Sequence, residues 1–349
     1  MNALKRKFIR LAALVLVITL ICFSAGCGSP ENGEETTRFT SVEVVELDAE
    51  TVDYYLSDKL EYQCFVYGIG GKYGTLGENG EKVSEPIFDK VYTGLTYSDD
   101  GDYAKWSLLG FAGDNEYLIS QDGKVTPADP YGIGFEEWCR VYWTEDGPRM
   151  FVYGIEDSEE RNCDFNEYYS YEFLAVNAYM SFPDRSLISR VIPVREVTEI
   201  KYENTEGYNV ATPVYKSEKY GLFDFDSKRM LTDFIYDDCT AFAVSGIFAA
   251  KKGDKWGYIT DTGKKITGFK YETSYDVKEY DSDRIKMFQP VNGYIVVKSG
   301  GKYGMIDTLG KTVAACEYDY LSQVNADGVF YGLKGGVWSR CTMAESKTE

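Results

Sequence analysis

The residue types that most often perform chemistry in proteins are scarce or scattered in this chain. Its 349 residues contain no histidine, which excludes a Ser-His-Asp or Cys-His nucleophile and a histidine zinc site. Carboxylates are abundant, with 56 Asp and Glu residues, and a pair of them can hydrolyse a glycosidic bond. Because so many acids form close pairs by chance, we predict no catalytic residue. A carboxylate-dependent glycan- or cell-wall-active enzyme is the alternative.

Six cysteines follow residue 27: Cys64, Cys139, Cys163, Cys239, Cys316 and Cys341. No two of them form a CxxC motif, so the sequence predicts no zinc ribbon and no thioredoxin-type site. Their neighbours are apolar and aromatic, as in YQCFVYG, which favours buried thiols. Disulfides are the other interpretation for an exported protein, and the sequence does not choose between the two.

Two acidic turns, Asp99-Asp100-Gly101-Asp102 and Asp281-Ser282-Asp283, contain possible calcium ligands. Neither continues into the EF-hand pattern with its final Glu, which favours solvated turns. The chain also lacks GxxxxGK[ST], and it has no GxGxxG between a predicted strand and a helix. We therefore predict no metal and no cofactor.

The N-terminus has the pattern of a signal peptide. Basic residues Lys5, Arg6, Lys7 and Arg10 precede an apolar run from Leu11 to Phe23, which is shorter than the roughly 20 residues that span a bilayer. The run ends in Ser24-Ala25-Gly26-Cys27, which resembles the lipobox of bacterial lipoproteins. The resemblance implies a mature chain that begins at Cys27, with a diacylglyceryl group on its thiol. An ordinary secretory signal with an incidental cysteine is the alternative.

The charge of the predicted mature chain narrows the choice of partners. Residues 27–40 have no apolar period and are predicted to be a flexible tether. Without residues 1–26 the chain has 33 Lys and Arg against 56 Asp and Glu, a net charge of −23. A field of this sign repels nucleic acid and anionic lipid headgroups. We therefore predict no nucleic-acid partner, and expect membrane attachment only through the N-terminal lipid, outside the cytoplasm.

A longer pattern recurs along the rest of the chain. Its clearest feature is Lys-aromatic-Gly, found at Lys72-Tyr73-Gly74, Lys219-Tyr220-Gly221, Lys255-Trp256-Gly257 and Lys302-Tyr303-Gly304. A turn residue lies six positions after each glycine, and an aromatic-acid pair such as Tyr271-Glu272 lies fourteen or fifteen positions after it. With weaker copies, the anchors fall near residues 74, 117, 160, 221, 257, 304 and 339. This spacing predicts about seven units of roughly 40 residues.

These units resemble the WG (KWG) β-repeats of bacterial proteins, whose consensus runs aromatic-Gly, Ile-Asp, a Gly-Lys turn and Pro-x-aromatic-acid. Tyr replaces Trp in three of the four clear copies, and the proline occurs in register only at Pro86. The clear copies cover about half of the predicted mature chain. The resemblance implies that the chain is a β-repeat protein.

One copy shows how the unit should fold. Ile247–Ala250 predicts a buried strand, KWGYIT a second strand, and ITGFKYE a third after a turn at Gly263. Gly257 lacks a Cβ, so a neighbouring aromatic ring can lie against its backbone. Three short strands cannot bury a face alone, so the units must stack.

We predict an all-β fold: an array of about seven short antiparallel three-stranded units, with a propeller-like ring slightly favoured over an open β-solenoid. In a ring, the strand at Ser41–Leu47 would complete the last unit and cover a sheet edge. The best helix candidate is Asp48–Leu60, with Val52 and Leu56 on one face. The predicted organisation is a signal peptide at 1–26, a tether at 27–40, a repeat domain at 41–343 with an insertion or degenerate repeat at about 156–205, and a polar tail at 344–349.

The aromatic residues divide into two groups. Those that recur in the repeat, Trp256, Tyr271, Tyr303 and Tyr318, are predicted to form the core. Those outside the period, Trp138, Tyr142, Trp143, Tyr168, Tyr169 and Tyr171, are better candidates for ligand contact, although ordinary packing explains them equally well. The predicted function is a non-catalytic, lipid-anchored extracytoplasmic module that binds an unknown protein or glycan.

Overall fold

The computed structural model describes residues 39–55, 64–77, 80–97, 104–120, 122–128, 138–153, 158–168, 188–205, 208–274 and 287–344. Within these ranges the chain is almost entirely β-structure, and the only helical segment is one turn at residues 165–168. The all-β prediction is confirmed. The predicted signal peptide, Cys27 and both acidic turns lie outside the described residues. No helix in the described ranges has the length and hydropathy of a membrane span.

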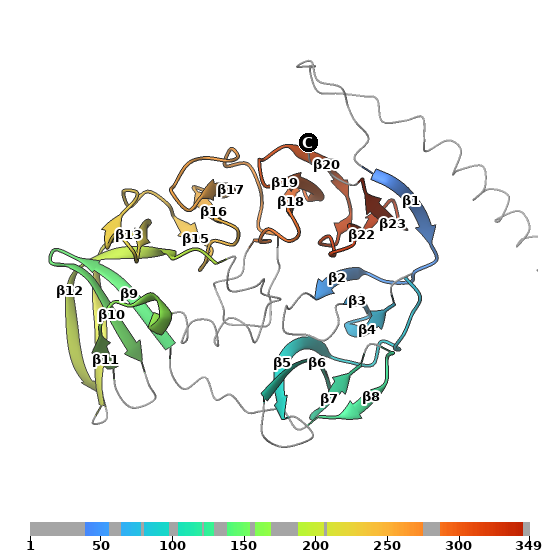
Figure 1. The fold of residues 1–349 in the computed structure, drawn as a ribbon, viewed down its shortest axis with the longest axis horizontal. Helices are drawn as coiled ribbons and strands as arrows, with labels where there is room; N and C mark the ends of the chain where they lie inside the picture. Colours follow the sequence, from blue (N-terminus) through green and yellow to red (C-terminus); the bar gives the residue numbers. More distant parts are fainter. Residues whose placement is uncertain are drawn as a thin grey trace, which may run out of the picture. The chain divides into compact units, whose positions relative to one another are not determined.

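The strands form six sheets, which we name A to F (Figure 1). In chain order the strands are β1 (Phe39–Val45), β2 (Thr51–Tyr55), β3 (Cys64–Ile69), β4 (Lys72–Leu76), β5 (Lys90–Tyr97), β6 (Ala104–Ala112), β7 (Asn115–Ile119), β8 (Val125–Pro127), β9 (Trp138–Thr144), β10 (Gly147–Tyr153), β11 (Ser158–Arg161), β12 (Val191–Thr205), β13 (Tyr208–Asp224), β14 (Arg229–Met230), β15 (Asp238–Cys239), β16 (Ile247–Lys252), β17 (Lys255–Thr260), β18 (Tyr294–Ser299), β19 (Lys302–Asp307), β20 (Thr312–Tyr318), β21 (Tyr320–Leu321), β22 (Val329–Lys334) and β23 (Val337–Met343). The strand orders are β1-β23-β22-β21 in sheet A, β2-β3-β4 in B, β5-β6-β7-β8 in C, β11-β10-β9-β12-β13-β14 in D, β15-β16-β17 in E and β18-β19-β20 in F.

The described residues form six sheets, whereas the sequence predicted about seven units. The anchors near residues 160 and 221 both fall in sheet D, because β9 pairs in parallel with β12 at Arg195↔Tyr142. This pairing joins β9, β10 and β11 to the repeat strands, so the residues near 160 do not build a separate sheet.

Sheet A combines the two ends of the repeat domain. β1 pairs antiparallel with β23, with Val42 opposite Cys341 and Val45 opposite Trp338 (Figure 1). The prediction that Ser41–Leu47 completes the last unit is confirmed. The strand begins at Phe39, inside the predicted tether.

The predicted helix at Asp48–Leu60 is wrong where the structure describes it. Residues 51–55 form β2, which pairs with β3 along its whole length. Val52 and Tyr54 are both buried, which is the alternation of a strand with one core face. Pairing with β3 therefore outweighs the helical spacing, while residues 56–60 lie outside the described ranges.

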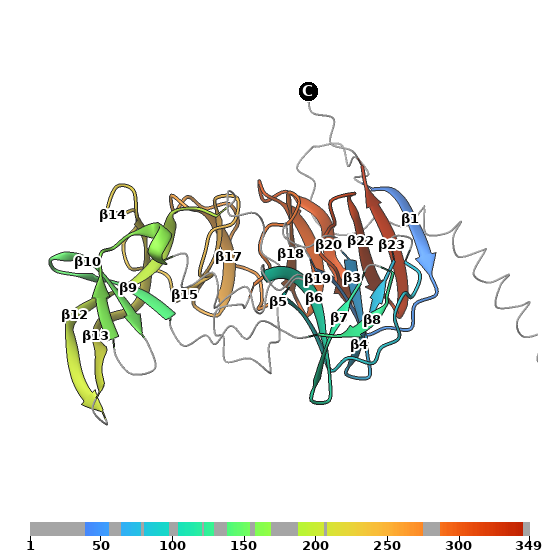
Figure 2. The same ribbon diagram turned by 60° about the horizontal axis from the view of Figure 1, so that its bottom comes forward.

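Hydrophobic clusters join consecutive sheets, as the stacking argument predicts. Phe330 of sheet A and Met305 of sheet F share one cluster, while Tyr331 of sheet A and Tyr67 of sheet B share another. Val66 and Leu108 belong to a cluster between sheets B and C. Leu222 and Phe248 belong to one between sheets D and E, and Tyr258 and Ile295 belong to one between sheets E and F. Figure 2 shows these small sheets from a second direction. Each sheet therefore buries its apolar side chains against its neighbours.

The third strand of the unit is interrupted in sheet E. Trp256↔Tyr271 and Ile259↔Lys265 are isolated bridges, because the Thr267 hydroxyl accepts a hydrogen bond from the Tyr258 amide at 2.9 Å in place of a ladder bond. In sheet F the equivalent residue is Ala314, which has no hydroxyl, and β20 is a strand with register shifts. The predicted third strand is therefore correct for sheet F and wrong for sheet E.

The glycine of the aromatic-Gly pair lies where another segment crosses the sheet. A Cβ on Gly257 would lie 2.9 Å from the Gly268 carbonyl oxygen and 3.1 Å from Phe269. At Gly74 and Gly304 a Cβ would lie 2.7 Å from a backbone oxygen. Backbone atoms cannot move aside cheaply, so only glycine fits at these positions. The predicted contact of an aromatic ring with the Gly257 backbone is confirmed.

We expect Gly257→Ala to lower the free energy of unfolding by about 1–3 kcal/mol, because the new methyl group overpacks against fixed backbone. Gly268→Ala is the matched control, since a Cβ there meets open space, and it should change the free energy by no more than about 0.5 kcal/mol. Urea unfolding followed by circular dichroism measures both. Equal losses in the two variants would contradict this explanation of the repeat glycine.

An acidic residue links consecutive sheets at four junctions. Asp237 accepts a hydrogen bond from Lys219 of sheet D at 2.5 Å and from the Gly253 amide in the next hairpin at 2.8 Å. We name each such lysine, acid and hairpin glycine an acid bridge. The other three are Lys72–Asp89–Gly113, Lys255–Glu272–Gly300 and Lys302–Asp319–Gly335. The Lys and the acid of the repeat motif therefore have a structural role.

The junction between sheets A and B is built differently. Glu50 has the backbone position of the bridging acids, since its amide donates to the Gly68 carbonyl, but Val337 stands where the bridging lysine would be. The Trp338 indole instead donates to the Ala49 carbonyl at 2.8 Å, and the Tyr320 hydroxyl donates to Asp53 at 2.6 Å. This junction therefore lacks an acid bridge.

The acid bridges should make stability depend on pH. The hydrogen bond from Lys219 lowers the pKa of Asp237 below its usual value of 3.8. A carboxyl whose pKa is lower in the folded state stabilises the fold above the unfolded pKa, and this contribution disappears as pH falls through the folded pKa. We expect Asp237→Asn to lower Tm at neutral pH and to reduce the fall in Tm between about pH 5 and pH 2. Thermal unfolding of Asp146→Asn, an exposed acid outside the bridges, is the control, and parallel curves for wild type and Asp237→Asn would contradict the prediction.

Candidate interaction surface on sheet D

Sheet D departs from the repeat more than any other described sheet. β12 and β13 have 15 and 17 residues, whereas no other described strand exceeds nine. The first part of this hairpin, residues 191–195 with 220–224, has the position of a repeat unit. We name the remainder, residues 197–205 and 208–215 together with β9, β10 and β11, the sheet D extension.

A bulge separates the extension from the repeat. The register passes from Arg195↔Tyr220 to Val197↔Tyr215, so residues 216–219 have no partner in the β12–β13 ladder. The Arg195 guanidinium lies 3.8 Å from the Tyr215 ring centroid and donates to the Tyr215 hydroxyl at 2.8 Å. It also donates to Glu218 in the bulge at 2.9 Å. Arg195 therefore fixes the geometry of this junction through stacking and charge-assisted hydrogen bonds.

The extension has a core of its own. Tyr142, Phe151 and Tyr153 pack against Val197 and Ala211 on one face. The Tyr142 and Tyr153 hydroxyl oxygens lie 3.2 Å apart, and burial is the largest cause of the raised pKa of Tyr142. These phenols are therefore neutral, structural groups.

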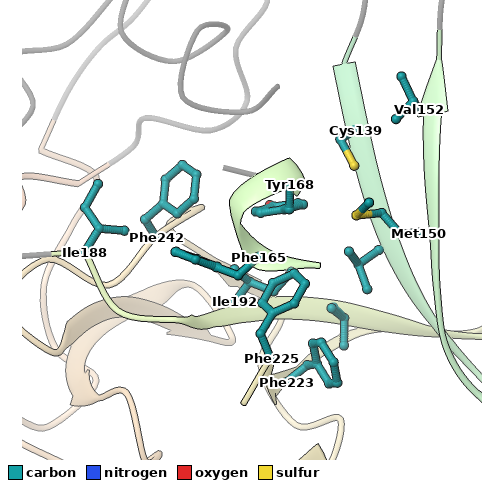
Figure 3. Packing of buried hydrophobic residues seen from close by; sticks show 12 residues of the cluster. Cys139, Met150, Val152, Phe165, Tyr168, Ile188, Ile192, Phe223, Phe225 and Phe242 are labelled. Carbon is teal, nitrogen blue, oxygen red and sulfur yellow. The ribbon is translucent and has the colours of Figure 1, made fainter. Parts of the chain in front are cut away.

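The opposite face of β9 and β10 packs against the repeat. Its cluster contains Cys139, Met150, Val152, Phe165, Tyr168, Phe223 and Phe225 (Figure 3). These side chains come from the extension, from the helical turn at 165–168 and from the repeat strands. With apolar packing on two faces, the extension is a rigid platform.

Three of the six predicted ligand-contact aromatics, Tyr142, Trp143 and Tyr168, belong to this packing. Tyr142 and Tyr168 are buried, and the Trp143 ring lies 6.0 Å from the Phe223 ring between centroids. The side chains of Trp138, Tyr169 and Tyr171 lie outside the described set. Among the predicted core aromatics, Trp256 and Tyr271 are buried, and Tyr303 and Tyr318 are half-buried.

The solvent-facing residues of the extension were not among the predicted ligand-contact aromatics. Tyr202 is 53% exposed. The hydrogen bond to Glu160 raises the pKa of Arg149, and the nearby Tyr202 acts in the same direction. Arg149 also donates from Nε to Glu160 at 2.7 Å. Tyrosine and arginine are enriched in protein interfaces because they combine large contact area with hydrogen bonding. The sequence held one overlooked signal, since seven of the ten arginines after Cys27 lie between residues 140 and 229.

The six cysteines after Cys27 are free thiols, three of them buried and three half-buried. Burial raises the pKa of Cys64 and of Cys341 to about 12, which keeps both in the unreactive thiol form. The structure supports the interpretation of these cysteines as small hydrophobic residues.

Among the described carboxyl groups with a shifted pKa, only Asp53 shifts upward. Burial raises its pKa to about 6, and the hydrogen bond from Tyr320 partly opposes this effect. The described ranges also contain no group of three or more Cys, Asp or Glu side chains that could hold a metal ion.

Comparison with known proteins agrees with the repeat geometry. Residues 220–256 and 303–338 match the WG containing repeat. The chain therefore contains WG repeats in these two segments. No curated protein was found to match this sequence.

Several solved structures are similar at low identity. Virginiamycin B lyase from Staphylococcus aureus is 11% identical, with 87% of this chain and 99% of that chain covered and a TM-score of 0.30. The WD40 β-propeller domain of Doa1 is 9% identical, with 88% and 97% covered and a TM-score of 0.30. The C-terminal WD40 domain of Sif2 is 10% identical, with 86% and 98% covered and a TM-score of 0.34.

We expect Arg195→Lys to loosen the extension without unfolding the repeats. Lysine keeps the charge but loses the planar stack on Tyr215 and the paired hydrogen bonds, a loss of about 1–2 kcal/mol. Hydrogen exchange of residues 197–205 and 208–215 should accelerate, while sheets E and F keep their protection. Arg190→Lys, which changes an arginine bonded to Asp226 outside the bulge, should leave the extension unchanged. Uniform acceleration across all sheets would contradict a local role for Arg195.

Proposed function

We propose that this WG-repeat protein is a non-catalytic, lipid-anchored module outside the cytoplasm, and that the sheet D extension binds its protein or glycan partner. The observation that carries the proposal is the exposed Tyr202 near the half-buried Arg149, on a platform with packed clusters on two faces. A rigid platform loses little conformational entropy on binding. An exposed tyrosine beside an arginine supplies contact area and hydrogen bonds to a partner surface.

The recurring residues of the repeat have structural roles, which supports the sheet D extension as the binding surface. Lysines and acids of the repeat are paired in acid bridges, and its glycines lie under crossing segments. These groups therefore hold the scaffold together, whereas Tyr202 and the Arg149–Glu160 pair lie outside the repeat pattern. The membrane anchor in the proposal rests on the resemblance of the segment ending in Cys27 to a lipobox.

Affinity capture from intact cells tests the binding surface. The tagged full-length chain is crosslinked in its host, and captured proteins and glycans are identified by mass spectrometry. We expect Tyr202→Ala combined with Arg149→Gln to reduce enrichment of the partner at least about ten-fold, as for loss of an interface hot spot. Leu309→Ser changes a side chain that is 75% exposed outside the extension and should keep the partner. Equal capture by all three proteins, or no enrichment by the wild type, would refute the proposed surface.

Metabolic labelling with an alkyne fatty acid tests the anchor separately. The wild-type chain should incorporate the label and fractionate with membranes, and Cys27→Ala should do neither. Labelling of Cys27→Ala at the wild-type level would refute attachment at this residue.

A further inference from the structure

β1 presents an open edge at the end of sheet A. It is the outermost strand in the order β1-β23-β22-β21, and β23 is its only partner among the described strands. The pairing is continuous from Ser41 to Val45. The backbone amides and carbonyls on the other side of β1 therefore have no strand partner in the described ranges, and such an edge can accept another chain.

In the other sheets, the edge formed by the segment after the repeat hairpin, which is the position of β1 in sheet A, is less suited to pairing. In sheets B and E the outermost segments pair only through the isolated bridges Tyr73↔Phe88 and Trp256↔Tyr271 and similar single contacts. Strands β8 and β14 have three and two residues, and β20 contains two register shifts. Short length and irregular register are the usual protection of edge strands. β1 has one irregularity, between Phe39 and Ser41, and contains neither lysine nor proline.

Exposed valines accompany this edge. Val42 and Val44 are 59% and 55% exposed, although both lie in a strand. Val337, 43% exposed, lies on the same face, because Ser339 two residues later is the partner of Val44. Contiguous exposed apolar side chains of this kind mark interaction sites more often than isolated ones do.

Acidic side chains predominate beside the edge. Glu43, Glu46 and Glu50 are exposed, and Glu43 lies opposite Arg340 in the β1–β23 ladder. The acids of the acid bridges, in contrast, each have a lysine. Val337 occupies the position of the missing lysine at this junction. The edge therefore combines exposed valines with an excess of negative side chains, and Arg340 of β23, opposite Glu43, is a cation beside it.

We propose that β1 binds an extended segment of a partner protein that alternates apolar and basic residues, which adds a strand to the open edge of sheet A. Main-chain hydrogen bonds would provide affinity, and the valines and glutamates would select the sequence. Charge argues against a second copy of this chain, because antiparallel pairing of two β1 strands would bring like-charged glutamates together, and each chain has a net charge of −19. This surface is separate from the sheet D extension.

A synthetic peptide tests the proposal directly. The probe is a fluorescein-labelled peptide of about eight residues that alternates lysine and valine, titrated into the purified full-length chain and followed by anisotropy. Glu43→Lys combined with Glu46→Lys should weaken binding at least about ten-fold, because cross-strand attraction becomes repulsion. Asp114→Lys combined with Glu145→Lys makes the same change in net charge at exposed turns and should leave affinity within about two-fold.

A backbone control separates strand addition from charge attraction alone. The same peptide N-methylated at alternate residues keeps its side chains but loses donors for a ladder, so its binding should also fall at least about ten-fold. Equal binding of the methylated peptide, equal loss in the two charge-reversed variants, or no binding by the wild type would overturn the proposal. A dimer in sedimentation velocity that Val44→Lys dissociates, without peptide binding, would instead assign the edge to a second copy. Tyr202→Ala with Arg149→Gln should bind the peptide as the wild type does, so this test is independent of the sheet D surface.

Discussion

Each sheet of this protein must bury its faces against another sheet, and the rest of the structure depends on that requirement. Several sheets have only three strands, and a single layer cannot bury its own apolar faces. The repeat residues meet the requirement at short range: a glycine allows a crossing segment to approach, aromatic rings fill the space between sheets, and an acid ties a lysine of one sheet to the next hairpin. The motif thus describes a junction between sheets as much as a unit.

Much of the fold could be predicted because this junction is local in sequence. Gly257 with Phe269, and β1 as the completing strand of sheet A, followed from spacing and from the need to cover an edge. The failures involve distant partners. The parallel pairing of β9 with β12 merges two predicted units, and β3 converts part of the predicted helix into β2. No local pattern encodes either pairing.

The candidate surfaces also depend on contacts between distant segments, which local sequence patterns do not encode. The bulge at Arg195 depends on an offset between two long strands, which composition does not reveal. Of the six candidate ligand-contact aromatics, the described Tyr142, Trp143 and Tyr168 belong to the packed clusters. The repeat uses its lysines and acids within the acid bridges, so the candidate surfaces lie where the pattern is broken. The sheet D extension and the junction of sheets A and B are two such places, and each exposes apolar side chains beside charged ones.

Sheet A contains strands from both ends of the described chain, and this constrains the order in which its strands can pair. Among the described strands β1 is synthesised first, and its partner β23 is synthesised last. Because nearly the whole sequence separates the two, their pairing closes a very long loop and cannot form during most of synthesis. Until β23 emerges, Val42 and Val44 lie on a strand with neither edge paired. The growing chain must therefore carry β1 unpaired during most of synthesis, and β1 can join sheet A only after β23 has been made.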